Sequence, residues 1–348
     1  MATKKRIAVI GVGYWGPNLA RNFEEMSNVE LVAVVDKSPE RIQKLTDRFP
    51  NIQPFGSYQE LFDLNLDAVV IATPPATHHA IAKECLENGL NVLVEKPLAL
   101  QSDHCEELIQ IAESKGLILM VGHVYEFNPG IQYIKGLIDS GELGDIYYID
   151  AVRASLGLFQ PDLNVMWDLA PHDLSIVLYL LGQFPESISA TGGSYVLNYL
   201  GVHDLGYMHL HFPDGAIANI RVSWLDPDKT RRITIVGSKK MLVFDDVGLE
   251  KIKVFDKGVD IHPDTDNYGD FQAHYRYGDA VTPHINWYEP LRSECEHFIS
   301  CIIEGKQPLT DGYDGLRVVK LLEASDEALQ NGGKSVDLHF GEKQLNKA

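Results

Sequence analysis

Short apolar runs alternate with amphipathic stretches over the first 122 residues. The apolar runs are rich in Val, Ile and Leu, which is typical of strands buried on both faces: 6–10, 30–35, 68–72, 91–94 and 117–121. Capping residues and stop signals between these runs predict helices at 17–26, 77–88 and 103–115. Two more helices are predicted to begin at Pro39, which follows the cap Ser38, and at the capping box Ser57-x-x-Glu60. This alternation predicts a doubly wound parallel sheet of about six strands.

The pattern changes after Gly122. Helices are predicted at about 129–140 and 168–181, with a strand at about 146–152 between them. Strand-like runs then follow one another without a long helix, which predicts a mostly antiparallel sheet: 187–196, 205–212, 216–224, 231–236 and 240–245. We interpret residues 258–288, which are rich in Gly, Asp, His and Tyr, as a long loop, and 290–304 and 313–331 as two closing helices.

The first apolar run leads into Gly11-x-Gly13-x-x-Gly16 and then Pro17, a favoured first helical residue. In a dinucleotide-binding turn the first glycine permits the tight bend, the second lets the backbone approach a pyrophosphate, and the third lets the helix pack on the strand. Asp36 ends the second strand, 20 residues after Gly16, where a carboxylate meets the ribose 2′-hydroxyl of NAD. This carboxylate would repel a 2′-phosphate, so the spacing predicts NAD rather than NADP.

Composition narrows the set of partners and compartments. The chain has 348 residues, 30 basic and 49 acidic side chains and a formal net charge of −19, which argues against nucleic acid or an anionic membrane as a partner. The apolar run 174–181 is too short to span a bilayer, and because the first residues lead directly into a predicted strand we expect no signal peptide. The four cysteines form no C-x-x-C pair, so we expect reduced thiols and a cytoplasmic protein.

Two further motifs join the glycine-rich turn: Glu95-Lys96-Pro97, and Asp168-x-x-x-His172. The three together resemble the Gfo/Idh/MocA family of NAD(P)-dependent oxidoreductases. The resemblance implies an α/β fold with an N-terminal Rossmann domain at 1–122 and a C-terminal α/β domain at 123–348, which contains a large open, mostly antiparallel sheet for substrate binding and oligomerisation. We expect a homodimer or homotetramer formed through that sheet, with the closing helices packed back on the first domain.

Lys96, Asp168 and His172 are the predicted catalytic residues. An ammonium at the end of a buried strand can polarise a carbonyl oxygen and stabilise a developing alkoxide, and the resemblance implies that Lys96 does so and that a cis bond precedes Pro97. His172 and Asp168 share one face of a helix, and imidazole suits deprotonation of a hydroxyl near neutral pH. The resemblance makes His172 the acid/base candidate and Asp168 a partner of substrate or lysine. Either Lys96 or His172 could move the proton.

The remaining predicted contacts follow the strand ends and the resemblance. Cofactor-binding residues are Gly11, Gly13, Tyr14, Trp15, Gly16, Asp36, Thr73, Pro74, His78, Glu95 and Lys96. Substrate-binding residues are His123, Tyr125, Arg153, Asp168 and Arg231. For His123 a structural role is an equal alternative. Many members of the family carry Arg where this chain has Glu126, which removes a cation near cofactor or substrate.

Several patterns have a second interpretation. Asp168 and His172 could ligate a metal ion, but no third ligand presents itself, so we expect no metal. Asp168 could instead cap its helix. His209-x-His211 could be a metal pair, although a solvated strand face explains it as well. The basic cluster 229–232, which contains Arg231, could clamp a diphosphate or could be an ordinary charged turn.

Segments 13–18, 167–173 and 289–292 are most similar to the sugar-nucleotide 3-dehydrogenase branch of the family. This similarity implies hydride transfer between NAD and C3 of a nucleotide-linked sugar, in surface polysaccharide or deoxysugar biosynthesis. A free-sugar or inositol dehydrogenase is the first alternative, and an NAD-dependent glycosidase the second. A non-catalytic NAD-binding regulator is a third class, against which the presence of Lys96 and His172 argues.

Overall fold

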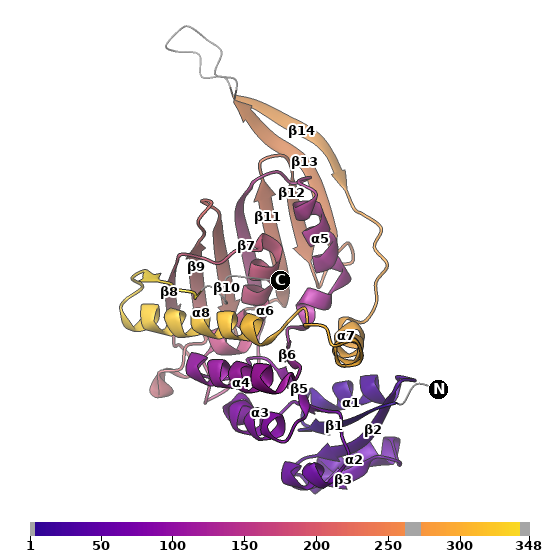
Figure 1. Ribbon diagram of the computed structural model, residues 1–348. Coiled ribbons are helices and arrows are strands. Elements are labelled where there is room, and N and C mark those ends of the chain that lie inside the picture. The colour runs from indigo at the N-terminus through magenta and orange to yellow at the C-terminus, as the bar shows by residue number, and fades with distance from the viewer. Residues whose placement is uncertain (1–3, 262–272, 342–348) are drawn as a thin grey trace. The chain divides into compact units, whose positions relative to one another are not determined.

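The structure is a computed structural model that describes residues 4–261 and 273–341 (Figure 1). The chain divides into two units. The first extends to Phe127 and includes Tyr288–Glu323, and the second comprises Asn128–Trp287 and continues from Ala324. The helix α8 (Gly312–Gln330) therefore contributes to both units.

The β-branched runs of the first unit form a parallel sheet, which confirms the predicted doubly wound half of the fold. Its six described strands lie in the order β3-β2-β1-β4-β5-β6. Successive strands are added on one side of β1 as far as β3 and on its other side from β4 onward, so the order of the strands switches between β1 and β4. All four residues of β4 are buried, as expected for a strand covered on both faces. The strands are β1 (Lys5–Ile10), β2 (Val29–Val35), β3 (Gln53–Phe55), β4 (Ala68–Ile71), β5 (Asn91–Glu95) and β6 (Leu119–Gly122).

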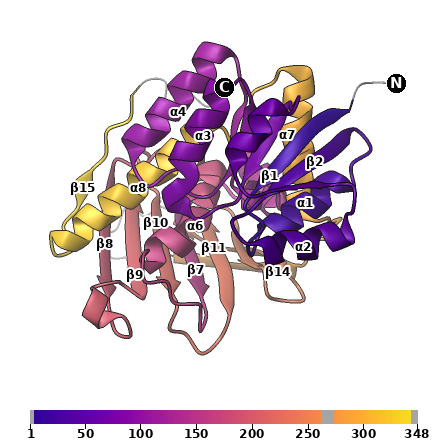
Figure 2. The ribbon, with the colours of Figure 1, turned by 90° about the horizontal axis from the view of Figure 1, so that it is seen from below.

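The helices of the first unit pack in pairs, α1 with α7 and α3 with α4, and Figure 2 shows the second pair side by side. Crossovers between parallel strands are right-handed, so the reversal of strand order places α1 and α2 on one face and α3 and α4 on the other. The predicted cap is present, since the Ser38 hydroxyl accepts a hydrogen bond from the Arg41 amide. The helices are α1 (Gly16–Glu24), α2 (Pro39–Arg48), α3 (His78–Glu87), α4 (Ser102–Lys115) and α7 (Pro290–Glu304).

Three short 3-10 helices complete the first unit: η1 (Tyr58–Asp63), η2 (Pro75–Thr77) and η3 (Val124–Phe127). The predicted capping box of Ser57 and Glu60 is present, but it opens η1 rather than an α-helix. In the described part of the chain, no helix combines the length and apolar character that a bilayer crossing requires.

The second unit contains a nine-stranded sheet in the order β14-β13-β12-β11-β7-β10-β9-β8-β15, counted over the described residues. Its neighbouring strands are antiparallel except β10 and β7, so the predicted mostly antiparallel sheet is confirmed. The strands are β7 (Ile146–Ala154), β8 (Ser187–Gly193), β9 (Leu205–His211), β10 (Ile217–Ser223), β11 (Thr230–Gly237), β12 (Met241–Asp245), β13 (Ile252–Ile261), β14 (Ala273–Val281) and β15 (Val336–Asp337).

One face of this sheet is covered and the other is open. The helix α6 (Val165–Leu181) packs on β7, β9 and β10, and α5 (Pro129–Asp139) packs on α6. The turn η4 (Asn198–Leu200) lies between β8 and β9. Along β9, Met208 and Leu210 are buried toward the helices, whereas Tyr207 and His209 alternate with them on the exposed side.

The predicted loop at 258–288 is wrong over much of its length. β13 and β14 form a long antiparallel hairpin there (Figure 1), and residues 262–272 lie outside the described chain. The prediction failed because β14 is exposed on both faces and shows no apolar alternation. Its side-chain pairing is ionic instead, since Arg276 of β14 forms ion pairs of 3.0 Å with Asp256 and Asp260 of β13.

We expect Phe298→Ala to weaken the first unit selectively. Phe298 of α7 is fully buried in one core with Ile7 and Val9 of β1, and its truncation should cost about 3–5 kcal/mol. Hydrogen exchange should therefore accelerate in β1 and α1 and stay unchanged in β9 and β10. Phe244→Ala, at a buried position of β12, is the matched control and should give the reverse pattern. Equal acceleration in both units by either variant would contradict two separate cores.

Candidate active site

The glycine-rich turn has the close contacts that its sequence predicts. Gly11 has φ +91°, and its amide donates to the Val35 carbonyl at 2.7 Å. A Cβ on Gly16 would lie 1.9 Å from the Gly11 carbonyl oxygen, so no other residue fits there. At Gly13 the nearest atom to an added Cβ is Arg41 Nη1 at 3.6 Å, which leaves this backbone open. The turn therefore fits a pyrophosphate at the start of α1.

The Asp36 carboxylate is fixed beside this turn. It accepts hydrogen bonds from the Val12 amide at 2.9 Å and from the Ser38 amide at 2.8 Å. Arg41 Nη1 lies 3.9 Å from Asp36 Oδ2, so a cation that our sequence analysis did not single out is also present. The sequence places Arg41 in the first turn of the helix that follows Asp36, which could have indicated that the two side chains lie close together. Tyr14, in contrast, is almost fully exposed.

His78 joins the segments that follow β4 and β5. Its imidazole is buried, with Nδ1 2.8 Å from the Pro97 carbonyl oxygen and Nε2 2.8 Å from that of Thr73. Burial lowers the pKa of His78, although the two carbonyl contacts oppose this shift. The Thr73 hydroxyl contacts that of Thr77 at 2.7 Å, and Pro74 directly precedes η2. The structure thus assigns His78 to holding two loops together.

Glu95 and Lys96 lie at the carboxyl end of β5, and the Lys96–Pro97 peptide bond is cis, as the resemblance implied. The Glu95 carboxyl accepts hydrogen bonds from the Lys96 amide at 3.2 Å and from the Trp15 side chain. An added Cβ on Gly122 would lie 3.1 Å from Glu95 Oε2, so the glycine at the end of β6 leaves room for this partly exposed carboxyl. Burial raises the pKa of Glu95 to about 7, against the opposing charge of Lys96.

The segment after β6 adds a buried acid to this region. His123, Tyr125 and Glu126 are all buried in the first unit. Glu294 of α7, which sequence analysis did not find, interacts there with Glu126 and Glu95. Its position carried a signal, since it occupies the helix face that also buries Leu291, Cys295 and Phe298, where an apolar residue is expected.

The second unit holds the other predicted catalytic residues on α6. Asn164 caps this helix by accepting from the amides of Met166 and Trp167, so the capping role considered for Asp168 is wrong. Asp168 Oδ2 instead accepts a hydrogen bond of 3.0 Å from Nε1 of Trp224, which is buried after β10. His172 lies one turn further along the same face of α6 and is partly exposed.

Arg153 is held by a buried ion pair beneath α6. Its Nε and Nη2 donate to the two carboxylate oxygens of Asp173 at 2.8 and 3.0 Å. The sequence predicted no role for Asp173. The structure shows that it attaches to β7 the turn of α6 that also carries His172. Arg231 lies directly opposite Arg153 across β11 and β7, and its Nη1 is 3.7 Å from Asp246. The two predicted substrate arginines are therefore neighbours, each beside a carboxylate.

The histidines His209 and His211 lie on the open side of β9. His209 Nδ1 is 2.6 Å from Asn219 Oδ1, and the Asn219 amide donates to Asp150, which gives a polar row across three strands. In residues 4–261 and 273–341, no three His, Cys, Asp or Glu side chains are grouped so that they could hold a metal ion. The solvated-face interpretation of these histidines fits this geometry.

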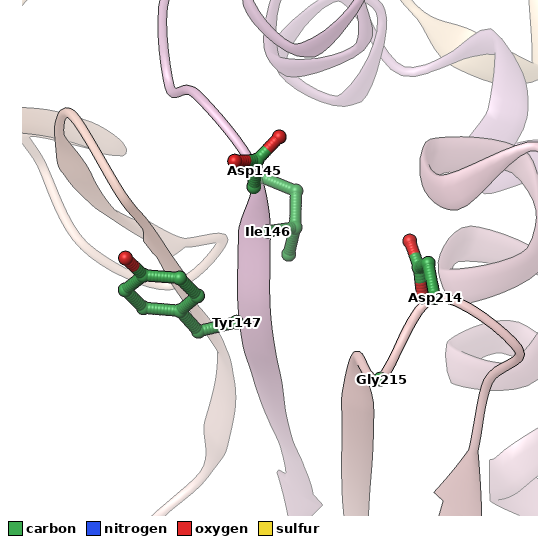
Figure 3. Close-up of a pocket in the computed structure, with 5 residues that line it drawn as sticks. All are labelled: Asp145, Ile146, Tyr147, Asp214 and Gly215. Carbon is green, nitrogen blue, oxygen red and sulfur yellow. The ribbon is translucent and has the colours of Figure 1, made fainter.

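A surface hollow of about 360 Å³ lies elsewhere in the second unit (Figure 3). Asp145, Ile146 and Tyr147 line it from the start of β7, and Asp214 and Gly215 line it from the turn between β9 and β10. The Asp214 carboxylate is occupied by the Ala216 amide and the Gln183 side chain. None of these lining residues is among the predicted cofactor-binding, substrate-binding or catalytic residues, so we do not include the hollow in the candidate site.

Comparisons with known proteins agree with this geometry. Residues 5–123 match an oxidoreductase family with an NAD-binding Rossmann fold, and residues 131–243 match the GFO/IDH/MocA C-terminal domain. UDP-N-acetylglucosamine 3-dehydrogenase of Acidithiobacillus ferrooxidans is 28% identical, over 90% of this chain and 94% of that protein. A solved structure of that enzyme has a TM-score of 0.77 at 26% identity, over 94% of this chain and 98% of that one. The scyllo-inositol 2-dehydrogenase (NAD(+)) of Bacillus subtilis is 26% identical, over 95% and 96% respectively.

We expect Gly16→Ala to abolish tight NAD binding. The new methyl group would overlap the Gly11 carbonyl oxygen, so the turn or α1 must shift away from the pyrophosphate site. Calorimetry should show an affinity at least about tenfold weaker, which corresponds to about 1.4 kcal/mol. Gly56→Ala, where nothing lies within 4 Å of the added carbon, is the matched control and should bind normally. Normal binding by Gly16→Ala would sink this assignment of the cofactor site.

We expect Arg153→Ala to destabilise the second unit by about 3–5 kcal/mol, because it leaves the buried Asp173 carboxylate without its partner. The double variant Arg153→Met/Asp173→Leu removes both charges and should lose far less stability. Urea denaturation followed by tryptophan fluorescence measures both. If the single variant is no less stable than the double variant, the pair does not contribute as described.

Proposed function

The chain belongs to the Gfo/Idh/MocA family of NAD-binding oxidoreductases, and from this premise we propose that it transfers a hydride between NAD and C3 of a nucleotide-linked sugar. One observation carries the proposal: the similarity to a UDP-N-acetylglucosamine 3-dehydrogenase spans both units, including the segments that hold Lys96 and His172. Surface polysaccharide or deoxysugar biosynthesis is the setting that we infer.

In this proposal the chain supplies a base and an electrostatic partner, while NAD accepts the hydride. His172 takes the proton of the C3 hydroxyl, since a partly exposed imidazole can exchange protons near neutral pH. Lys96 stabilises the developing alkoxide. Asp168, oriented by the Trp224 indole, completes the polar face of α6. The proton roles of His172 and Lys96 can be exchanged.

A free-sugar or inositol dehydrogenase is the second candidate, and one observation favours it. Arg153 and Arg231 are each beside a carboxylate, so neither is an uncompensated cation that awaits a diphosphate. The relative named as a scyllo-inositol 2-dehydrogenase also covers nearly the whole chain. A diphosphate would have to displace Asp246 from Arg231.

We also propose that the protein is a cytoplasmic homodimer or homotetramer. The four cysteines are buried and unpaired with one another, which fits a reducing compartment. The open sheet face carries two partly exposed aromatic side chains, Tyr148 on β7 and Tyr207 on β9, the strands on either side of β10. A second copy would cover such a face by an isologous contact.

The decisive test is single-turnover absorbance of the protein with NAD⁺ and a panel of UDP-sugars, dTDP-sugars, free sugars and inositols. We expect reduced nicotinamide only with a nucleotide sugar, and a rate about 10²–10⁴ lower for His172→Ala. His211→Ala, exposed on β9, is the control and should keep the wild-type rate. A signal with free sugars or inositols alone would transfer the assignment to the second candidate.

A further inference from the structure

The β13–β14 hairpin continues the sheet of the second unit beyond β12 (Figure 1). β12 pairs with residues 252–255 at the start of β13, whereas β13 continues to Ile261 in its pairing with β14. Side chains along a strand point alternately to the two sides of a sheet, and directly opposite residues of an antiparallel pair share a side. The register therefore assigns each residue of the hairpin either to the side that the helices cover or to the open side.

The helix side of the hairpin is filled by its own ion pairs. Val254 is buried on this side, so Asp256, Gly258 and Asp260 follow it there by alternation. Arg276 stands opposite Gly258, where its guanidinium occupies the space of a side chain, and it pairs with both carboxylates at 3.0 Å. These charged groups are thus satisfied within the hairpin.

The open side of the hairpin is apolar and exposed. Tyr275 stands opposite Val259 and Tyr277 opposite Lys257, and the centroids of the two tyrosine rings are 6.3 Å apart. Val259, Tyr275 and Tyr277 are 49%, 65% and 78% exposed. The Lys257 ammonium lies 5.5 Å from the centroid of the Phe255 ring, so its charge is drawn toward the sheet. Contiguous exposed apolar side chains of this kind mark a surface that another molecule covers.

This apolar surface continues across the open face of the sheet. Phe255 lies opposite Met241 of β12, and Met241 lies opposite Val236 of β11. Val236 in turn lies opposite Tyr148 of β7, whose partner on β10 is Ile217. Each of these residues follows or precedes a residue that is buried toward the helices, so the row lies on the open side. We call this row, together with the open side of the hairpin, the apolar band.

The charges of the open face indicate that the partner is a second copy. Two copies of a chain with a formal net charge of −19 repel each other unless the surface between them lacks this excess of acid. An isologous contact also needs both signs, because each side chain meets other residues of the same face. Among the described residues of β7 and β9–β13, the Asp, Lys and Arg side chains on the open side are four basic and two acidic: Arg221, Arg232, Lys253, Lys257, Asp150 and Asp245.

We propose that the apolar band is the contact surface for a second copy of this chain, and that the β13–β14 hairpin is an arm by which each copy extends this contact beyond its own sheet. The inference rests on the homo-oligomer proposed above and deepens it, because it names the part of the open face that becomes buried. The polar row of His209, Asn219 and Asp150 lies two residues along each strand and borders the band.

Sedimentation velocity of the full chain over a series of protein concentrations tests the arm. For Tyr275→Thr/Tyr277→Thr we expect the Kd of self-association to rise at least about tenfold, because two aromatic side chains leave the contact. Threonine keeps the strand propensity of tyrosine, so the far-UV circular dichroism should not change.

Tyr195→Thr/Tyr199→Thr is the matched control. These tyrosines are 64% and 77% exposed, nearly the same fractions as those of the arm. They lie between β8 and β9, next to the start of β9, whereas the band crosses the sheet at Ile217, which pairs with the last residue of β9. The control should therefore keep the wild-type Kd.

Tyr148→Thr tests whether the band continues onto the sheet. Tyr148 is 37% exposed and lies in the row between Val236 and Ile217. We expect this variant to weaken the same self-association, since one surface contains both the sheet row and the arm.

Three results would overturn the inference: a monomeric wild-type protein, an unchanged Kd in Tyr275→Thr/Tyr277→Thr, or a loss of association in that variant with none in Tyr148→Thr. The last result would limit the contact to the edge of β14. A monomeric wild-type protein also removes the proposed homo-oligomer, whereas the other two results leave it standing. All three are measured without cofactor or substrate, so they are distinct from failure of hydride transfer, which would appear as absent reduction of NAD⁺ with every sugar.

Discussion

The close approach of Gly16 to Gly11 is the constraint on which the first unit depends. β1 turns into α1 so tightly that the Gly11 carbonyl oxygen fills the space of a Cβ on Gly16. Because the turn is this tight, the Val12 amide reaches the Asp36 carboxylate and the Trp15 side chain reaches Glu95. Two residues without side chains thus set the position of the backbone amide that holds the carboxylate expected at the ribose.

The second unit depends on a different interaction, the buried pairing of unlike charges. A chain with 19 more acidic than basic side chains has carboxylates available for its interior cations. The Asp173 carboxylate accepts two hydrogen bonds from the Arg153 guanidinium, and Asp246 lies between Arg231 and Lys251. Arg153 is therefore buried beneath α6, and the charge of Arg231 is compensated by a carboxylate. Neither arginine offers an uncompensated positive charge to a phosphate.

Much of this architecture could be predicted from sequence because its signals are local. The runs that became β1, β2 and β4 are mostly apolar, and Ser38 and Gly116 mark helix ends by their own chemistry. β14 could not be predicted, since its pairing depends on backbone bonds and on Arg276 meeting Asp256 across the hairpin. A strand exposed on both faces has no pattern to detect.

The candidate site divides in the same way. Lys96, His172 and the glycines stand in motifs, so a resemblance could find them, and Glu126 stood out as a departure from Arg. That Glu126 meets Glu95 and Glu294 depends on three segments that are distant in sequence. A fixed arginine would hold one charge throughout a reaction cycle. An acid at this position supplies no such fixed positive charge, so whatever compensates Glu95 and Glu294 must come from other segments of the first unit.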